Sequence, residues 1–254
     1  MFPKFMHARV YSKPWMEVEQ DLLPVVVDRQ RDAVDVGAYV GSYTLLLAKL
    51  ARTVYAFEPD VEMATMLRRV APPNVRVSHN AVSDREGTSE FHVPSFKGRR
   101  VVTCGSLVAP RERDYDVRLV KTTTLDAALA NSDVGFIKID VEGAERSVLT
   151  GAQQLIARCR PVILVEANTA EAVATVSAFF EPLEYAGFFV HAGRMFGLRE
   201  FKVDMQDPRL WDEHALQRQM RPLNNFFFAP SDAETELRAE IDRFLARETG
   251  TPVR

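Results

Sequence analysis

From Ala33 onward the chain alternates short apolar or β-branched runs with longer segments whose apolar residues recur at helical spacing. This order is typical of a parallel sheet whose strands are joined by helices that cover both of its faces. Strands are expected at Ala33–Val36, Thr53–Phe57, Val75–His79, Phe136–Val141, Val162–Val165, Phe188–His191 and Asn225–Phe228, and helices at Tyr43–Leu50, Glu62–Val70, Ala144–Ala157 and Ala170–Phe180. The sequence therefore predicts an α/β fold with a doubly wound, mostly parallel, seven-stranded sheet.

The composition is that of one globular domain. Of the 254 residues, 46% are hydrophobic and 26% are charged, which argues against a disordered or fibrous chain. A net charge of −3 without a long Lys/Arg run predicts no nucleic-acid partner. Cys104 and Cys159 are too few for a disulfide framework, and no run approaches the roughly 18 apolar residues of a membrane span. We therefore expect a cytoplasmic protein without a membrane partner, and homo-oligomerisation stays open.

Three segments flank or interrupt the predicted sheet. Residues 1–32 have apolar side chains at mixed three- and four-residue spacing, from Trp15 to Val26, which predicts a helical lid or brace. The main domain, residues 33–230, is interrupted at 94–121 by a Pro-, Gly- and Arg-rich insertion that we expect to be structureless. Residues 96–121 carry a local charge of +4, which would attract an anionic acceptor or simply face water. Residues 231–254 predict a C-terminal helix packed on the same domain, with a capping box at Ser231 and Glu234.

The first strand ends in a turn with two glycines, Asp35-Val-Gly37-Ala-Tyr39-Val-Gly41, and a helix follows. Gly37 and Gly41 would let a polar ligand approach the backbone, while the first N–H groups of the helix favour a carboxylate there. Asp35 would meet the ammonium group or a bound water of an amino-acid-like ligand, or else cap the turn. Thr44 belongs to the same segment, and tyrosine at position 39 disfavours a dinucleotide, whose turn needs glycine against the pyrophosphate.

Two further strand ends provide candidate nucleoside contacts. The second strand ends in Ala56-Phe57-Glu58-Pro59, where the Glu58 carboxylate can accept both hydroxyls of a ribose and Pro59 follows directly. After the third strand, Ala81 and Val82 either contact an adenine ring or form an ordinary strand-to-loop transition. Together with the glycine turn, these positions predict a cofactor site for a nucleoside that carries a short polar chain.

Acidic residues follow the fourth strand, at the edge where open α/β sheets bind their ligands. Asp140 and Glu142 are expected near the reacting group, and neighbouring strand ends supply Glu166, Asn168 and His191. Two catalytic arrangements stay open. In one, Asp140, Glu166 and Asn168 form the all-oxygen set that Mg²⁺ prefers. In the other, His191 is a base that needs no metal.

These segments together resemble the FkbM-like methyltransferases. The signature of that family is similar to Ile137-Lys-Ile-Asp140-Val-Glu142-Gly143-Ala-Glu145 and Leu149-x-Gly151-Ala152. Four earlier segments are also similar to the family and occur in the same order as there, namely Asp35-Val-Gly-Ala-x-x-Gly41, Phe57-Glu58-Pro59, Ala81-Val82-Ser83-Asp84 and Thr122-Thr-Thr-Leu-Asp126. The resemblance covers about Ala33 to Asn168 and continues more weakly to Pro230. It implies a class I methyltransferase fold, which is Rossmann-like, with S-adenosyl-L-methionine as the donor. It also implies transfer mostly to oxygen atoms of sugars or secondary metabolites.

The predicted function is therefore O-methylation of a small-molecule acceptor, at a hydroxyl of a sugar or secondary metabolite. Such a hydroxyl needs a general base or a metal, whereas a carboxyl acceptor would need neither, and a carboxyl O-methyltransferase therefore stays open as well. An NAD-dependent oxidoreductase and a non-catalytic nucleoside-binding scaffold are also compatible with the sequence. Neither of these two is excluded by the first strand-helix-strand unit alone.

Overall fold

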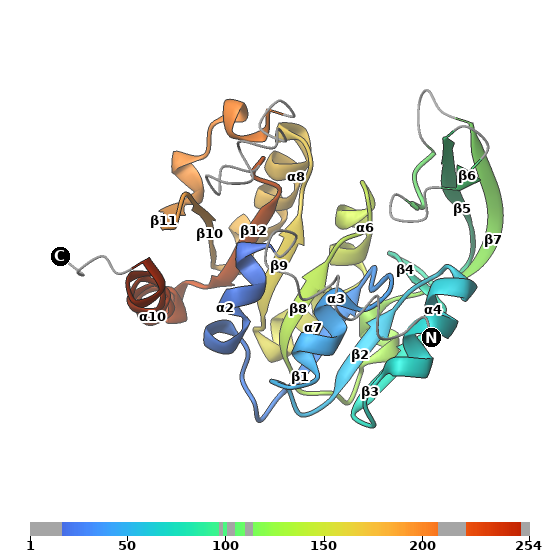
Figure 1. Cartoon of the computed structure of the whole chain (residues 1–254), viewed down its shortest axis with the longest axis horizontal. Coiled ribbons are helices and arrows are strands. Elements are labelled where there is room, and N and C mark those ends of the chain that lie inside the picture. The colour runs from blue at the N-terminus through green and yellow to red at the C-terminus, as the bar shows by residue number, and fades with distance from the viewer. Residues whose placement is uncertain (1–16, 97–98, 101–104, 110–113, 208–221, 250–254) are drawn as a thin grey trace.

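The computed structural model describes residues 17–96, 99–100, 105–109, 114–207 and 222–249 (Figure 1). The expectations for Trp15, for Cys104 and for the basic residues Lys97, Arg111 and Arg113 of the insertion fall outside these residues. No helix in the described ranges is both long enough and apolar enough to cross a membrane.

The main sheet has eight strands rather than seven, in the order β11-β10-β12-β9-β8-β1-β2-β3. They are β1 (Asp32–Val36), β2 (Val54–Phe57), β3 (Val75–Ser78), β8 (Val134–Ile139), β9 (Val162–Glu166), β10 (Tyr185–His191), β11 (Arg194–Gly197) and β12 (Asn225–Pro230). From β3 to β9 all neighbours are parallel, whereas β12 is antiparallel to β9 and β10, and β11 is antiparallel to β10. The additional strand, β11, follows a tight turn at Ala192 and Gly193, both with positive φ, as hairpin turns require.

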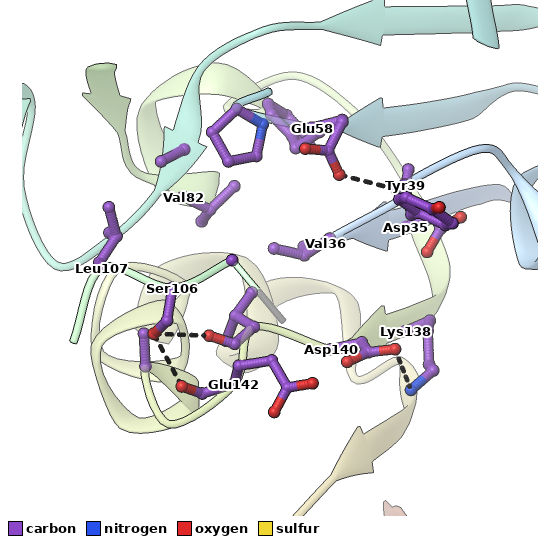
Figure 2. A pocket seen from close by; sticks show the side chains of 18 of the residues that line it. Asp35, Val36, Tyr39, Glu58, Val82, Ser106, Leu107, Lys138, Asp140 and Glu142 are labelled. Atoms are coloured by element: carbon purple, nitrogen blue, oxygen red, sulfur yellow. Dashed lines mark hydrogen bonds and ion pairs between the residues drawn. The ribbon is translucent and has the colours of Figure 1, made fainter. Parts of the chain in front are cut away.

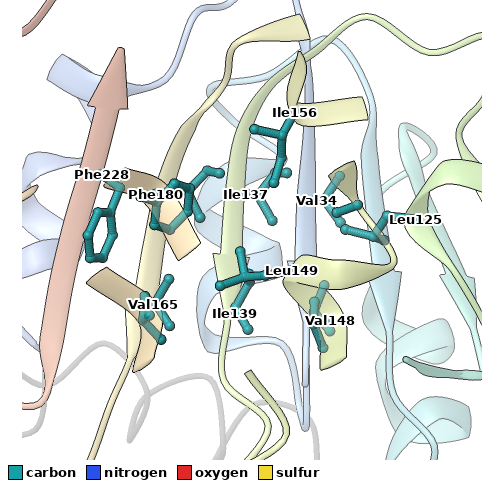
Figure 3. Packing of buried hydrophobic residues seen from close by; sticks show 14 of the residues in the cluster. Val34, Leu125, Ile137, Ile139, Val148, Leu149, Ile156, Val165, Phe180 and Phe228 are labelled. Atoms are coloured by element: carbon teal, nitrogen blue, oxygen red, sulfur yellow. The ribbon is translucent and has the colours of Figure 1, made fainter. Parts of the chain in front are cut away.

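Helices cover both faces of this sheet. They are α2 (Val18–Val26), α3 (Ser42–Leu47), α4 (Val61–Val70), α5 (Leu125–Ala128), α6 (Glu145–Thr150), α7 (Gln153–Cys159), α8 (Ala170–Phe180) and α10 (Ser231–Thr249), with short 3-10 turns η3 (Glu181–Leu183), η4 (Leu198–Glu200) and η5 (Val203–Gln206). On one face, Ile137 and Ile139 of β8 pack with Val148 and Leu149 of α6 (Figure 3). On the other face, Phe136 packs in a cluster with α2, α3 and α10. Strand β8 is thus buried on both sides, as central parallel strands are.

The helix expected at Ala144–Ala157 is two helices, α6 and α7, which meet at Gly151. A Cβ atom at Gly151 would lie 2.1 Å from the backbone oxygen of Ser83. The Gly151 carbonyl accepts a hydrogen bond from the Asp126 amide at 2.9 Å. The Asp126 carboxylate in turn accepts hydrogen bonds from two amides in the first turn of α7, at 3.1 and 2.8 Å. The helix therefore breaks where neighbouring loops pack directly on its backbone.

The insertion contributes to a second sheet, so the expectation that it is structureless is wrong at both of its ends. Strands β5 (Gly87–Phe96) and β7 (Tyr115–Thr123) form an antiparallel hairpin. With β4 (Ala81–Val82) and β6 (Arg99–Arg100) they make a four-stranded sheet in the order β4-β7-β5-β6. In β7, exposed Leu119 alternates with Val120, which is buried. This period of two is that of a strand with one solvated face.

The first described helix and the last helix, α2 and α10, contact each other on one face of the main sheet (Figure 1). Leu22 and Leu23 of α2 are buried in the same cluster as Ile241 and Leu245 of α10. Helix α2 also contacts α3. These helices therefore form a continuous layer that ends beside the loop after β1.

Strands β1 and β8 make a close backbone contact just beyond their carboxyl ends. The Asp140 amide donates a hydrogen bond to the Val36 carbonyl at 2.9 Å. Gly37 has a φ of +82°, and a Cβ atom there would lie 1.7 Å from the backbone oxygen of Asp140. Glycine is therefore required at position 37 both by its conformation and by this contact.

We expect Gly37→Ala to destabilise the fold far more than Gly41→Ala. Gly41 also has a positive φ, +92°, but its Cβ would meet a side-chain carbon of Leu67, at 2.4 Å, which can move. Gly41→Ala should cost about 1–2 kcal/mol, the usual cost of a left-handed residue. Gly37→Ala should cost more than about 4 kcal/mol, because a backbone oxygen must move. Urea unfolding measures both, and equal losses would contradict this account of the junction.

Candidate functional site

A pocket opens at the carboxyl edge of the main sheet, beside the second sheet (Figure 2). It is lined by Asp35, Val36, Gly37, Ala38, Tyr39, Ser42, Tyr43, Phe57, Glu58, Pro59, Ala81, Val82, Phe91, Gly105, Ser106, Leu107, Lys138, Asp140, Val141, Glu142 and Ala144. Most of these residues lie at the carboxyl ends of β1, β2 and β8 or in the loops that follow, and the others come from the start of α3 and from the second sheet with its loop 105–107. The pocket thus lies where open α/β sheets bind their ligands.

Most of the predicted cofactor residues line this pocket, namely Asp35, Gly37, Tyr39, Glu58, Pro59, Ala81, Val82 and Asp140. Gly41 and Thr44 are not among the lining residues. Gly41 precedes α3, and the space that it leaves free is filled by Leu67 and not by the pocket. Thr44 is fully buried, and its hydroxyl donates a hydrogen bond to Asp35 Oδ2 at 2.5 Å. These two residues therefore support the turn from its side away from the pocket.

Glu58 closes one end of the pocket and is 6% exposed. Its Oε2 accepts a hydrogen bond from the Tyr39 amide at 2.7 Å (Figure 2), and its Oε1 accepts one from the Asp60 amide at 2.8 Å. Burial raises the pKa of Glu58 to about 7, although the two amides lower it. Each oxygen has a second lone pair, so the carboxylate can accept further hydrogen bonds from hydroxyl groups.

The opposite end is built around Lys138, whose side chain is 1% exposed. Its Nζ lies 3.7 Å from Asp140 Oδ2 and 3.8 Å from Glu166 Oε2. The Asp140 side chain is 34% exposed and lines the pocket, whereas that of Glu166 is 18% exposed and lies outside the lining. Lys138 thus brings together the two acids that the sequence predicted as catalytic.

Burial raises the pKa values of the carboxyl groups around this end. It raises the pKa of Asp35 to about 6, against the Thr44 hydrogen bond and the Lys138 charge. Burial together with the Asp140 charge raises the pKa of Glu142 to about 7. The same two causes raise the pKa of Glu166. Because a nearby positive charge favours the ionised form of a carboxyl, a cationic ligand would be attracted to this end.

The predicted Mg²⁺ site at Asp140, Glu166 and Asn168 is not formed. The Asn168 amide donates to Glu142 Oε2 at 3.2 Å and does not join the other two residues. The Lys138 ammonium lies where the shared cation would be. Across the described ranges, no group of three or more His, Cys, Asp or Glu side chains is placed to hold a metal ion. The donor set therefore does not fit a divalent metal.

His191 is not brought to this site. It ends β10, and both β12 and β9 lie between β10 and β8 in the sheet. Its register partner is Arg194 of β11. The structure thus separates His191 from Asp140, although both lie at strand ends.

The second sheet is attached at both ends of the pocket. The Ser106 hydroxyl donates hydrogen bonds to the Glu142 carbonyl at 2.7 Å and to the Val141 carbonyl at 3.3 Å (Figure 2). On the Glu58 side, Arg118 of β7 lies 3.3 Å from Asp60 Oδ2. The hairpin and the loop between its strands therefore form one wall of the pocket.

Sequence reasoning missed Lys138, Tyr43, Ser106 and Leu107 as pocket residues. Lys138 had a signal, because a lysine inside an apolar strand must find charged partners when buried. Ser106 had none, since its place depends on a bridge to His92 across the insertion.

The chain matches the family model described as the methyltransferase FkbM domain over residues 35–190, more than half of its length. A probable ribosomal RNA small subunit methyltransferase A from Pyrobaculum aerophilum is 50% identical over 44 residues, 17% of this chain and 19% of that protein. The protein of the same description from Pyrobaculum islandicum is 48% identical over 46 residues, 18% of this chain and 20% of that protein. The match thus spans about a fifth of the length of these relatives.

The crystal structure of methyltransferase FkbM from Methylobacillus flagellatus KT superposes with a TM-score of 0.50 at 18% identity. The superposition covers 79% of this chain and 44% of that chain. This likeness shows a shared Rossmann-like class I fold, as expected from the sequence. Together with the match over residues 35–190, it leads to one assignment: the chain belongs to the FkbM methyltransferase family.

Proposed function

We propose that this protein transfers the methyl group of S-adenosyl-L-methionine to a hydroxyl oxygen of a sugar or secondary metabolite. The observation that carries the proposal is a pocket with Glu58 at one end and Asp140 at the other, on either side of the Gly37 turn. Such a pocket suits a donor with a nucleoside end and a reacting end. The family match supports the same reaction class.

Glu58 is the proposed ribose contact. Its carboxylate is already oriented by the amides of Tyr39 and Asp60, so the ribose hydroxyls would meet acceptors that are fixed in place. Ala81 and Val82 are 4% and 3% exposed and offer an apolar wall for adenine. The methionine part of the donor would then extend past the turn at Gly37 toward β8.

Asp140 is the proposed general base. The donor supplies a methyl carbon bound to a positively charged sulfur. As the acceptor oxygen bonds to that carbon, the carbon–sulfur bond breaks and its electron pair stays on sulfur. The hydroxyl proton passes to the Asp140 carboxylate and then to water. Asp140 suits this role because its side chain lines the pocket while one oxygen faces Lys138.

A hydroxyl acceptor fits this site better than a carboxylate. Asp140, Glu142 and Glu166 gather at the reacting end around the Lys138 ammonium, and a further carboxylate would be repelled by them. The exposure of Asp140 to the pocket also favours an enzyme over a non-catalytic scaffold. No metal-assisted reaction is proposed, because Lys138 takes the place of the cation.

RNA is the second candidate acceptor, because the relatives that match over a short segment are described as probable ribosomal RNA methyltransferases. The acidic residues at the reacting end would repel a polyanion there. A nucleotide would need its phosphates held elsewhere, for example by basic side chains of the insertion.

A binding and acceptor screen tests the proposal. Titration calorimetry with S-adenosylhomocysteine and with NADH should show binding of the first only. Donor labelled in its methyl group should then label methyl glycosides, but not the carboxyl group of matched uronic acids, and EDTA should leave the rate unchanged. Binding of NADH alone would favour an oxidoreductase, and label confined to an RNA transcript would favour the second candidate.

We expect Glu58→Ala to weaken the binding of S-adenosylhomocysteine. The ribose hydroxyls would lose charge-assisted hydrogen bonds worth about 1.5–3 kcal/mol, a change of roughly tenfold to a hundredfold in the dissociation constant. Titration calorimetry measures this, with the exposed Glu86→Ala as the matched control. An unchanged dissociation constant would remove Glu58 from the ribose role.

We expect Asp140→Asn to lower kcat by at least roughly a hundredfold, because asparagine keeps the size of the side chain but cannot accept the proton. The affinity for S-adenosylhomocysteine, which has no charge on sulfur, should change less than about threefold. Asp84→Asn, at an exposed loop position, is the control. Near-normal turnover of Asp140→Asn on the labelled acceptor would show that Asp140 is not the base.

A further inference from the structure

Lys138 lines the pocket but has no part in the reaction proposed above. It extends from β8 between Ile137 and Ile139, and its side chain is 1% exposed. An unpaired ammonium in such surroundings would be strongly destabilising. The chain therefore has to surround Lys138 with compensating groups, and these groups define what Lys138 can do.

The ammonium is held from several elements at once. Its distances are 3.7 Å to Asp140 Oδ2, 3.8 Å to Glu166 Oε2 and 3.3 Å to Asn225 Oδ1. It also lies 5.2 Å from the centre of the Tyr43 ring, within the range of a cation–π contact. Strands β8, β9 and β12 and helix α3 thus fix one position for the charge.

A further carboxylate adjoins this group from the start of α2. Glu17 Oε2 accepts a hydrogen bond from the Tyr43 hydroxyl at 2.5 Å and another from Asn225 Nδ2 at 3.2 Å. Both donors also contact Lys138. Glu17 therefore belongs to the same hydrogen-bonded network.

Several carboxyl groups surround the single Lys138 ammonium. Burial alone would lower the pKa of Lys138, but Asp140, Glu166, Glu17 and Asp35 raise it above its usual value. The ammonium therefore stays charged, and its removal would leave these carboxyl groups without a compensating positive charge. The net charge at the reacting end thus depends on this one side chain.

Donor and product differ by one positive charge at this end of the pocket. The sulfur of S-adenosyl-L-methionine is a cation, and the sulfur of S-adenosylhomocysteine is neutral. Both compounds share the same amino-acid group, so a change in nearby fixed charge acts on both, and the sulfonium adds an effect that only the donor shows. The ratio of the two affinities therefore reports the charge near the sulfur. A loss of packing, by contrast, weakens both together.

We propose that Lys138 is the residue that sets the charge of the reacting end: its ammonium positions Asp140 and Glu166, limits their attraction for the sulfonium, and so fixes the preference of the pocket for donor over product. The inference rests on the proposed function, because it needs S-adenosyl-L-methionine in this pocket. It assigns Lys138 a positioning role and no contact with the reacting atoms.

Calorimetric titration of S-adenosyl-L-methionine and S-adenosylhomocysteine at pH 8 tests this proposal. Lys138→Met should raise the preference for the donor about fivefold or more, as expected when one unit charge leaves a partly screened pocket. Lys138→Arg keeps the charge and should stay close to the wild-type ratio. Lys121→Met removes the same charge from an exposed position of β7 and should leave the ratio unchanged. Asp140→Asn removes a negative charge and should shift the ratio toward the product.

The outcomes separate the two proposals. If the wild type binds neither compound, the proposed function fails. If it binds both, and Lys138→Met weakens them equally or leaves their ratio unchanged, the role of Lys138 is only structural and this inference is overturned. Should Lys138→Met not fold, Lys138→Gln carries the same expectation, because its amide can still donate hydrogen bonds to the carboxylates without the charge. Circular dichroism confirms that each variant is folded.

Discussion

The backbone of Gly37 packs on the backbone of Asp140, and the geometry of the site follows from this contact. The Val36 carbonyl accepts a hydrogen bond from the Asp140 amide, and no side chain fits at position 37. The loops after β1 and β8 are therefore in direct contact, which places Asp35 beside Lys138 in register. A pocket that needs groups from both strands can form only where these loops touch.

Buried charge is the second constraint, because the carboxyl edge of the main sheet collects more acids than it can leave unpaired. Lys138 compensates them inside the sheet, and backbone amides do so at Glu58. Both arrangements hold carboxylates in fixed directions without a metal. The groups that offset the burial of charge thus also orient the carboxylates, which is what a site for methyl transfer requires.

The sequence was sufficient for the main architecture because its strands are mostly apolar and its helices have regular spacing. Helix α8 has the predicted bounds, and most strands agree within a few residues. The positions of Glu58 and Asp140 at the carboxyl edge of the sheet were also predicted, because the ends of apolar strands can be recognised in the sequence. The break at Gly151, the hairpin of β5 and β7 and the lining position of Ser106 depend on contacts between distant segments. No local pattern encodes such contacts.

Two charged side chains near the pocket, Arg118 and Lys138, differ in how far they are exposed to water. Arg118, whose side chain is 41% exposed, reaches Asp60 from the solvent side, whereas Lys138 is almost fully enclosed. At physiological ionic strength mobile ions screen charges over about 8 Å, and they act mainly on exposed pairs. Rising salt should therefore loosen the Arg118 attachment while the charge at the reacting end stays as it is. Ionic strength is thus a means of varying the wall of the pocket separately from its chemistry.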